Sequence, residues 1–176
     1  CIGSKKGEIR LYDEIGKNAK NLLRCYGDSI IGIDVTQNGK YILATCERYL
    51  LFIDIVPKNN PEFTGFTVNI KKDSPSPKTL KIKPIDIAKY HLENATFTPA
   101  KFNIGKEGED SIITSLGEYI VIWNLKKIKK GILDDYRIKK VSQVIIENQF
   151  KYNKNQVVVT MPNNLGIQNQ KKFFSP

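Results

Sequence analysis

Apolar residues in this chain gather into short runs, and a phrase that joins two such runs across a polar turn occurs four times. Each copy is thirteen residues long and ends in Asp or Asn. The copies are CIGSKKGEIRLYD (1–13), ILATCERYLLFID (42–54), IITSLGEYIVIWN (112–124) and VVVTMPNNLGIQN (157–169). Their final residues are Asp13, Asp54, Asn124 and Asn169, at intervals of 41, 70 and 45 positions. These intervals indicate an internal repeat.

The unit around the second copy shows its elements most clearly. Residues 31–35 alternate apolar and other side chains, as a half-buried strand does. Asn38-Gly39 then predicts a hairpin turn in which both central residues take positive φ. Residues 41–45 and 49–55 are continuous apolar runs, which indicate strands covered on both faces. The unit therefore begins with three antiparallel strands.

The same order of elements recurs in the rest of the chain. Strands are predicted at 96–102, 111–115 and 118–125, and again at 144–150, 156–161 and 165–168. The charged loop GKEGED (105–110) replaces the Asn-Gly turn in the first set, and residues 152–155 replace it in the second. A weaker outer strand is expected at 22–26, 66–70 and 136–141. A four-stranded unit repeated about every 40–45 residues predicts an all-β fold, a β-propeller of four-stranded antiparallel blades.

The interval of 70 residues contains the one irregular region of the repeat. An insertion is expected at 57–94, with the basic, proline-broken stretch KKDSPSPKTLKIKP (71–84) and a short helix at 85–92. The predicted organisation is a blade end (1–26), a blade with the insertion (27–72), a second blade (95–142), a partial blade (143–170) and a tail (171–176). We expect about four blades of a larger propeller. Because the chain starts with Cys1 inside the first copy, we also expect a longer protein.

The composition of the chain indicates in which cellular compartment the protein is expected. No apolar stretch approaches the 18 residues of a membrane span, and the start CIGSKKGE, with no apolar run behind a basic one, is not expected to be a signal peptide. The three cysteines, Cys1, Cys25 and Cys46, have neither an even count nor metal-site spacing. They are expected to be small buried apolar residues of a reducing compartment. We therefore predict a cytoplasmic location, with the nucleus as an alternative.

The formal net charge of +10 suggests an acidic partner, nucleic acid or anionic lipid. Only four of the 28 basic residues are Arg, and Lys lacks the planar fork that makes specific phosphate or guanine contacts. The bias towards Lys, Ile and Asn is also typical of an AT-rich genome. The densest basic run, Lys126, Lys127, Lys129 and Lys130, is expected on a rim loop. It is a candidate anionic surface site, although a solvated loop is the simpler interpretation.

The residues that enzymatic or metal chemistry needs are scarce. His91 is the single histidine and falls in the insertion, far from any nucleophile elbow. The sequence predicts no catalytic residue, cofactor site or metal site. Ser74-Pro75 and Ser76-Pro77 are weak candidates for phosphorylation by a proline-directed kinase.

Propellers commonly bind partners with the loops that join second to third strands and one blade to the next. These loops contain charged and aromatic residues, which is typical of interfaces. The candidate partner-binding residues are Asp28, Glu47, Arg48, Tyr49, Glu118, Tyr119, Asn163 and Asn164.

Four longer phrases carry a more specific resemblance: EIRLYDEIGKNAKN (8–21), GDSIIGIDVTQNGKYILATCERYLLFID (27–54), TFTPAKFN (96–103) and IWNLKKIKKGILDDYRIKK (122–140). Together they resemble the C-terminal WD-repeat-like domain of the Vid27-type vacuolar import and degradation family, which includes the plant defective-embryo-and-meristems proteins. The resemblance implies a propeller at the end of a longer intracellular protein and no enzymatic activity. No copy of the repeat ends in Trp-Asp and no Gly-His pair is present, so the polar relay of typical WD blades cannot form.

The expected function is a non-enzymatic protein-interaction scaffold with a link to vacuolar or vesicular trafficking and degradation. The alternative is a lysine-rich electrostatic binder of anionic membrane or RNA. The protein partner is not identifiable from the residues. Since an incomplete propeller exposes sheet edges and blade faces, we expect either a homodimer or an arc that lacks the other half of its ring.

Overall fold

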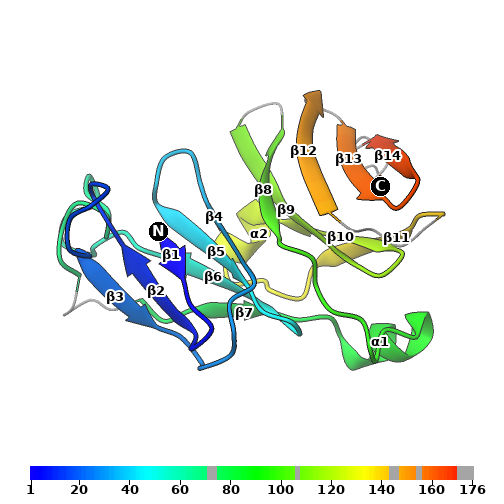
Figure 1. The fold of residues 1–176 in the computed structure, drawn as a ribbon, viewed down its shortest axis with the longest axis horizontal. Helices are drawn as coiled ribbons and strands as arrows, with labels where there is room; N and C mark the ends of the chain where they lie inside the picture. Colours follow the sequence, from blue (N-terminus) through cyan, green and yellow to red (C-terminus); the bar gives the residue numbers. More distant parts are fainter. Residues whose placement is uncertain (71–74, 106–107, 143–146, 154–155, 170–176) are drawn as a thin grey trace. The chain divides into compact units, whose positions relative to one another are not determined.

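A computed structural model of the chain describes residues 1–70, 75–105, 108–142, 147–153 and 156–169. The chain divides into two compact units, residues 1–80 and residues 81–176. Each unit contains two antiparallel sheets, and every sheet is built from strands that are consecutive in sequence (Figure 1). Such meanders of short strands are the expected form of propeller blades.

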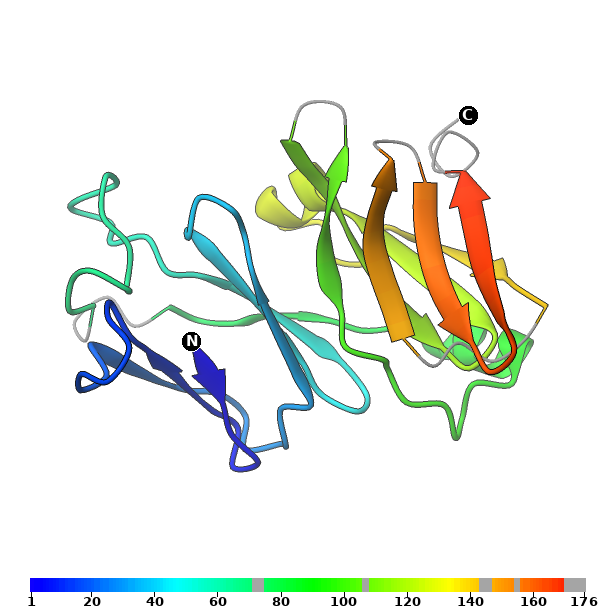
Figure 2. The same cartoon turned by 45° about the horizontal axis from the view of Figure 1, so that its top comes forward.

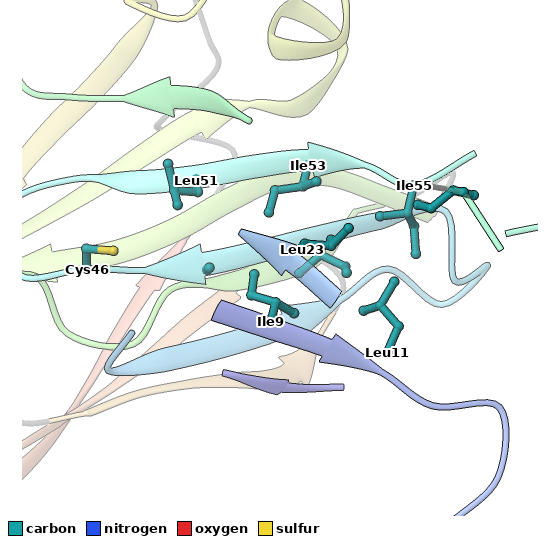
Figure 3. Close-up of a cluster of buried hydrophobic side chains, with 10 residues drawn as sticks. Ile9, Leu11, Leu23, Cys46, Leu51, Ile53 and Ile55 are labelled. Carbon is teal, nitrogen blue, oxygen red and sulfur yellow. The ribbon is translucent and has the colours of Figure 1, made fainter. Parts of the chain in front are cut away.

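The first unit stacks a three-stranded sheet on a four-stranded one. The first sheet contains β1 (Ile2–Gly3), β2 (Glu8–Leu11) and β3 (Asn21–Arg24) in that order. The second contains β4 (Gly32–Val35), β5 (Tyr41–Thr45), β6 (Leu50–Asp54) and β7 (Lys78–Leu80). Alternate residues of the strands, including Ile9, Leu23 and Ile53, meet in one buried apolar cluster (Figure 3). Leu43 and Phe52, on the other face of the second sheet, are also buried, which confirms that β5 and β6 are covered on both faces.

The outer strand predicted at 66–70 is wrong, because β7 at 78–80 pairs with β6 instead. The buried Asn21 explains the difference. Its side-chain amide donates to the carbonyls of Gly65 (2.5 Å) and Val68 (2.7 Å), and its Oδ1 accepts from the backbone N–H of Ile70 (2.9 Å). Ile70 is buried in the cluster that the first two sheets share. These bonds hold residues 65–70 against the first sheet, so their backbone groups are not available to β6.

Two turn predictions also need correction. In the Asn-Gly turn only Gly39 has positive φ, and the hairpin closes through a longer loop in which Thr36 N–H donates to the Tyr41 carbonyl (3.0 Å). Thr36 and Asn38 side chains complete that loop (2.8 Å). In GKEGED the strands continue through Gly105 on one side and Gly108 on the other, which pair with each other. The loop is therefore shorter than predicted, and residues 106–107 lie outside the described residues.

The second unit holds the other two sheets. The larger contains β8 (Lys101–Gly105), β9 (Gly108–Leu116), β10 (Tyr119–Asn124) and β11 (Tyr136–Lys140). The smaller contains β12 (Glu147–Asn153), β13 (Gln156–Met161) and β14 (Asn164–Asn169), drawn in orange to red in Figure 2. Trp123, which is buried, packs between Phe97 and Tyr136 at ring-centroid distances of 6.3 and 5.4 Å. The first strand of the larger sheet starts at 101, later than predicted, although Phe97 already forms an antiparallel bridge with Leu116 of β9 and the Thr98 hydroxyl lies 2.7 Å from that of Ser115.

Two short helices flank the larger sheet. Helix α1 (Pro84–Tyr90) confirms the predicted helix and begins with proline, whose fixed φ suits a first helical position. Helix α2 (Leu125–Lys129) follows β10, and the Asn124 side chain caps it by accepting from the Lys127 N–H (3.2 Å). The lysine run predicted on a rim loop therefore lies on and just after a helix. Part of the strand predicted at 144–150 falls on residues outside the described ones, as do Ser74 and the turn at 154–155.

Candidate partner-binding site

Four of the predicted partner-binding residues meet in one pocket of the first unit. The connection between β3 and β4 provides Asp28, and the turn between β5 and β6 provides Glu47, Arg48 and Tyr49. They line a hollow of about 220 Å³ together with Ser29 and Cys46. The turn is tight because Cys46 N–H donates to the Tyr49 carbonyl (2.9 Å), which is the last backbone bond of the hairpin. The structure thus brings together the connection that leads into a blade and a turn within that same blade.

A hydrogen bond joins the two segments of this pocket. The Tyr49 hydroxyl donates to Asp28 Oδ2 at 2.5 Å, and the Tyr49 ring meets the edge of Tyr26 at a centroid distance of 6.4 Å. Burial, and then the bond to Asp28, raises the pKa of Tyr49 above its usual range. Tyr49 therefore stays protonated near neutral pH and acts as a fixed donor. Tyr26 is 59% exposed, so it offers a large aromatic surface beside the pocket.

The pocket combines exposed charged side chains with a buried thiol. Asp28, Glu47 and Arg48 are exposed charges of both signs, which can pair with complementary groups of a partner. The pocket also contains the Cys46 thiol, whose pKa is raised by burial. Burial also raises the pKa of Cys25 to about 11. Since the thiolate is the reactive form, neither cysteine is activated at neutral pH.

Glu118 and Tyr119 lie in the second unit, in a different cluster. Glu118 forms an ion pair with Lys140 (3.1 Å), whose ammonium lies 5.8 Å from the centre of the Tyr119 ring. Tyr119 also packs on Tyr90 of helix α1 at 5.2 Å. Sequence reasoning missed Lys140 and Tyr90, because strand pairing and the packing of the insertion helix bring them here. The pairing of Tyr119 with Lys140 across β10 and β11 is the signal that could have identified Lys140.

The remaining candidates occupy separate places. Asn163 is exposed in the turn between β13 and β14, and Asn164 is the first residue of β14, where it pairs with Met161. Of the predicted residues, the structure groups Asp28, Glu47, Arg48 and Tyr49 at one pocket and Glu118 with Tyr119 at another cluster. Ser29 and Cys46 are pocket residues that sequence reasoning missed, although both are direct neighbours of predicted ones.

The lysine run forms the outer side of helix α2. Leu125 and Ile128 are buried beneath it, while Lys126, Lys127, Lys129 and Lys130 are exposed. Lys127 forms an ion pair with Asp135 at 2.5 Å. Lys126 and Lys127 also line a pocket of about 440 Å³ with Arg137 and two carboxylates, Asp110 and Asp135. The surroundings of the run are therefore mixed in charge.

The described residues contain no cluster of three or more His, Cys, Asp or Glu side chains arranged to hold a metal ion. Among the same residues, no helix is long and apolar enough to cross a bilayer. The three cysteines are free thiols. Cys46 is buried, and Cys1 and Cys25 pack against the same apolar cluster, as expected for small apolar residues.

Comparison with known proteins matches the whole chain. A family model described as the VID27 C-terminal WD40-like domain matches residues 1–176. The vacuolar import and degradation protein 27 of Schizosaccharomyces pombe is 37% identical over 184 residues, and that of Saccharomyces cerevisiae is 34% identical over 192. Both alignments cover all of this chain but 23% and 24% of those proteins, so the chain spans about a quarter of their length.

A solved structure shows the fold. The β-propeller domain of Cps50 (Swd1) from Myceliophteria thermophila superposes with a TM-score of 0.66 at 10% sequence identity. The superposition covers 95% of this chain and 49% of that one. The predicted all-β fold, part of a larger propeller with antiparallel blades, is confirmed.

Proposed function

Because the chain belongs to the family defined by the VID27 C-terminal WD40-like domain, we propose that it is a non-enzymatic protein-interaction scaffold. Its relatives are named for vacuolar import and degradation, and we extend a role in that process to this chain. WD40-like propellers typically serve as interaction platforms. The protein partner is of unknown identity, and the proposed location is cytoplasmic, which suits three free thiols.

One observation carries the proposal: the pocket formed by Asp28, Glu47, Arg48 and Tyr49. Its residues come from the two kinds of loop that propellers use for binding, and the bond from Tyr49 to Asp28 fixes them in one arrangement. A preformed site loses less conformational entropy when a partner binds. Tyr26, Tyr49 and Arg48 are of residue types that are enriched at protein interfaces, and Asp28 and Glu47 suit the polar rim of one.

The residue chemistry favours binding over catalysis. The pocket combines carboxylates, a guanidinium and a phenol without a base next to an activated nucleophile. Its thiol at Cys46 is held in the neutral form by burial, which raises its pKa. The proposed scaffold therefore acts through recognition, and no reaction is assigned to it.

Quantitative affinity purification of the intact protein tests this function. Proteins recovered with the wild type are compared with those recovered with the double variant Asp28→Asn, Tyr49→Phe. The matched control is Lys126→Gln, Lys127→Gln, which removes two exposed charges from helix α2. We expect the recovered amount of a defined set of proteins to fall at least about tenfold with the pocket variant, which is the loss expected for one buried anchor at an interface. With the control variant the recovered amount of these proteins should not change.

The opposite outcome supports the electrostatic alternative. In that outcome the wild type and the pocket variant bind RNA or anionic vesicles at physiological salt, and the Lys126, Lys127 variant does not. Charge-driven binding would then be the function in place of the scaffold.

A further inference from the structure

Ser76 is an exposed hydroxyl in an extended segment of the first unit. Residues 75–77 belong to no helix or strand, and β7 starts directly after them at Lys78. That strand is the outermost of its sheet and pairs through three residues only, from Lys78 to Leu80. Ser76 lies two residues before the first paired residue of that strand. The segment around Ser76 is therefore able to enter the cleft of another protein without unfolding its sheet.

The residue after Ser76 restricts which enzymes can act on it. Pro77 has no backbone N–H, so a protein kinase that needs this donor in its substrate does not accept the site. Kinases that are directed by proline do not need it. Lys78 adds a cation two residues after the hydroxyl.

A second dipeptide of the same kind is protected, which provides an internal comparison. Thr98 precedes Pro99, but its hydroxyl is 2.7 Å from Ser115 Oγ and accepts from the Ser115 N–H at 3.1 Å. The Thr98 carbonyl accepts from the Thr114 hydroxyl at 2.6 Å. Phosphorylating Thr98 requires its hydroxyl to leave both contacts with Ser115, whereas Ser76 is exposed.

Ser76 is also linked to the candidate partner-binding pocket. The carbonyl of Pro77 accepts a hydrogen bond from the Tyr26 hydroxyl at 3.1 Å. The Tyr26 ring packs against Tyr49, and Tyr49 donates to Asp28 in the pocket. One aromatic side chain thus contacts both the segment of Ser76 and the wall of the pocket.

We propose that Ser76 is a phosphorylation site for a proline-directed protein kinase. The Ser76 oxygen attacks the γ-phosphorus of ATP, and the bond from that phosphorus to the β,γ-bridging oxygen breaks. ADP leaves, and the hydroxyl proton passes to the catalytic base of the kinase. The product is a phosphoserine with a charge of about −1.5 to −2 at neutral pH, next to the carbonyl that holds Tyr26.

The consequence for the pocket rests on the proposed function, whereas the modification site does not. A dianion beside Pro77 competes with the weak bond from Tyr26 and changes the aromatic rim that a partner would contact. The link also runs in the other direction, because releasing Tyr26 from the Pro77 carbonyl leaves the segment of Ser76 with one contact fewer to break when it enters a kinase.

The test uses the folded 176-residue chain with ATP and a purified mitogen-activated or cyclin-dependent kinase, and maps phosphate by mass spectrometry. Synthetic peptides of residues 70–82 and 93–104 give the rates without the fold. We expect the phosphorylation rate of Ser76 in the chain to be within about tenfold of the rate in its peptide. The rate of Thr98 in the chain should be at least about 100-fold below the rate in its peptide, because the fold must first open locally around Thr98. Ser76→Ala should abolish the phosphate on this segment in a Ser74→Ala background.

Two outcomes overturn the proposal. One is a folded chain, or a 70–82 peptide, that acquires no phosphate on Ser76. The other is Thr98 modified as readily as Ser76 in the folded chain, which would mean that the fold does not select the site.

A tyrosine variant tests the link to the pocket. Tyr26→Phe keeps the ring but removes the bond to Pro77, and we expect the rate at Ser76 to rise about two- to tenfold, the range for one hydrogen bond. The control Tyr90→Phe, in the second unit, should leave the rate unchanged. An unchanged rate in Tyr26→Phe would contradict the coupling between Ser76 and the pocket.

Discussion

The side chain of Asn21 holds residues 65–70, the segment that follows β6, against the first sheet. Asn21 is 3% exposed, and its side-chain amide forms hydrogen bonds with three backbone groups of residues 65–70. A buried amide of this kind costs free energy when its partners are lost. The side chain therefore connects β3 by hydrogen bonds to a segment more than forty positions later in the chain.

The change Asn21→Ala should release this segment. We expect the amides of residues 60–70 to exchange about 10- to 100-fold faster, because roughly 1–3 kcal/mol of hydrogen bonding is lost. Hydrogen exchange with mass spectrometry measures this for the segment directly. Asn18→Ala, at an exposed position, is the control. Unaltered exchange at 60–70 in Asn21→Ala would show that apolar packing alone holds the segment.

Two tyrosines should make the fold sensitive to alkali. Burial raises the pKa of both Tyr49 and Tyr136, with further contributions from the bonds to Asp28 and Asp86. Between about pH 10, where an unfolded tyrosine ionises, and the higher folded pKa, the unfolded chain binds fewer protons. The free energy of unfolding should therefore fall as pH rises above about 10, and fall less steeply in Tyr49→Phe, Tyr136→Phe.

Urea unfolding from pH 7 to pH 11.5 measures this dependence. Between pH 7 and pH 9 the two proteins should respond to pH in parallel, since these phenols are protonated in both states. Equal slopes above pH 10 would contradict the assignment.

At the scale of elements, the first turn packs against the chain that leads to the second blade. Gly7 has φ of +71°, and a Cβ there would lie 2.8 Å from Gly27 N. The Gly7 carbonyl also accepts from Cys25 N–H (3.0 Å). The close approach of these two backbones positions the connection that carries Asp28.

The variants Gly7→Ala and Gly16→Ala separate two costs of an added Cβ: the close contact with the Gly27 backbone, which only Gly7 has, and the strain of a positive φ, which both positions share. Gly16 also has positive φ (+87°), but a Cβ there meets no atom within 4 Å. Gly16→Ala should cost about 1 kcal/mol in the free energy of unfolding, and Gly7→Ala about 1–3 kcal/mol more, because the backbone of Gly27 must move. Urea unfolding compares them. Equal costs would mean that the turn relaxes freely.

The strands that sequence could predict are those whose signal is local. Continuous apolar runs located β5 and β6, and the spacing of repeats located β13 and β14. The outer strand of the second blade was predicted at the wrong place because the side chain of Asn21, distant in sequence, forms hydrogen bonds with the backbone of residues 65–70. Helix α2 was predictable in principle: Asn124 is a favourable cap, and Leu125 and Ile128 have helical spacing.

For the whole molecule, the propeller architecture selected four loop residues that the structure places around one hollow, whereas their role in binding stays a prediction. Asp28, Glu47, Arg48 and Tyr49 were selected as loop residues of a propeller, and they do line one hollow. Tyr26 could not be selected, because its role depends on packing across two loops. The cluster of Tyr90, Tyr119 and Lys140 likewise depends on where the insertion helix docks.

The first sheet suggests self-association of the isolated chain. On its outer face Ile2 and Leu22 pair with Arg10 and are 58% and 41% exposed. We expect light scattering to give about twice the 20.0 kDa of one chain, and Leu22→Glu to shift the mass towards the monomer by placing a charge on this face. Lys17→Glu, at another exposed position, is the control. A stable 20.0 kDa species at high concentration would exclude the homodimer.

Site-specific photo-crosslinking in the intact protein tests the central claim, recognition of a protein through the Asp28 and Tyr49 pocket, most directly. A photoreactive residue replaces Arg48 in one variant and Lys129 of helix α2 in the other. Recognition through the pocket should give a discrete protein adduct from position 48 that disappears with Asp28→Asn, Tyr49→Phe, and none from position 129. Adducts from position 129 alone, or adducts at 48 that survive the pocket variant, would contradict it.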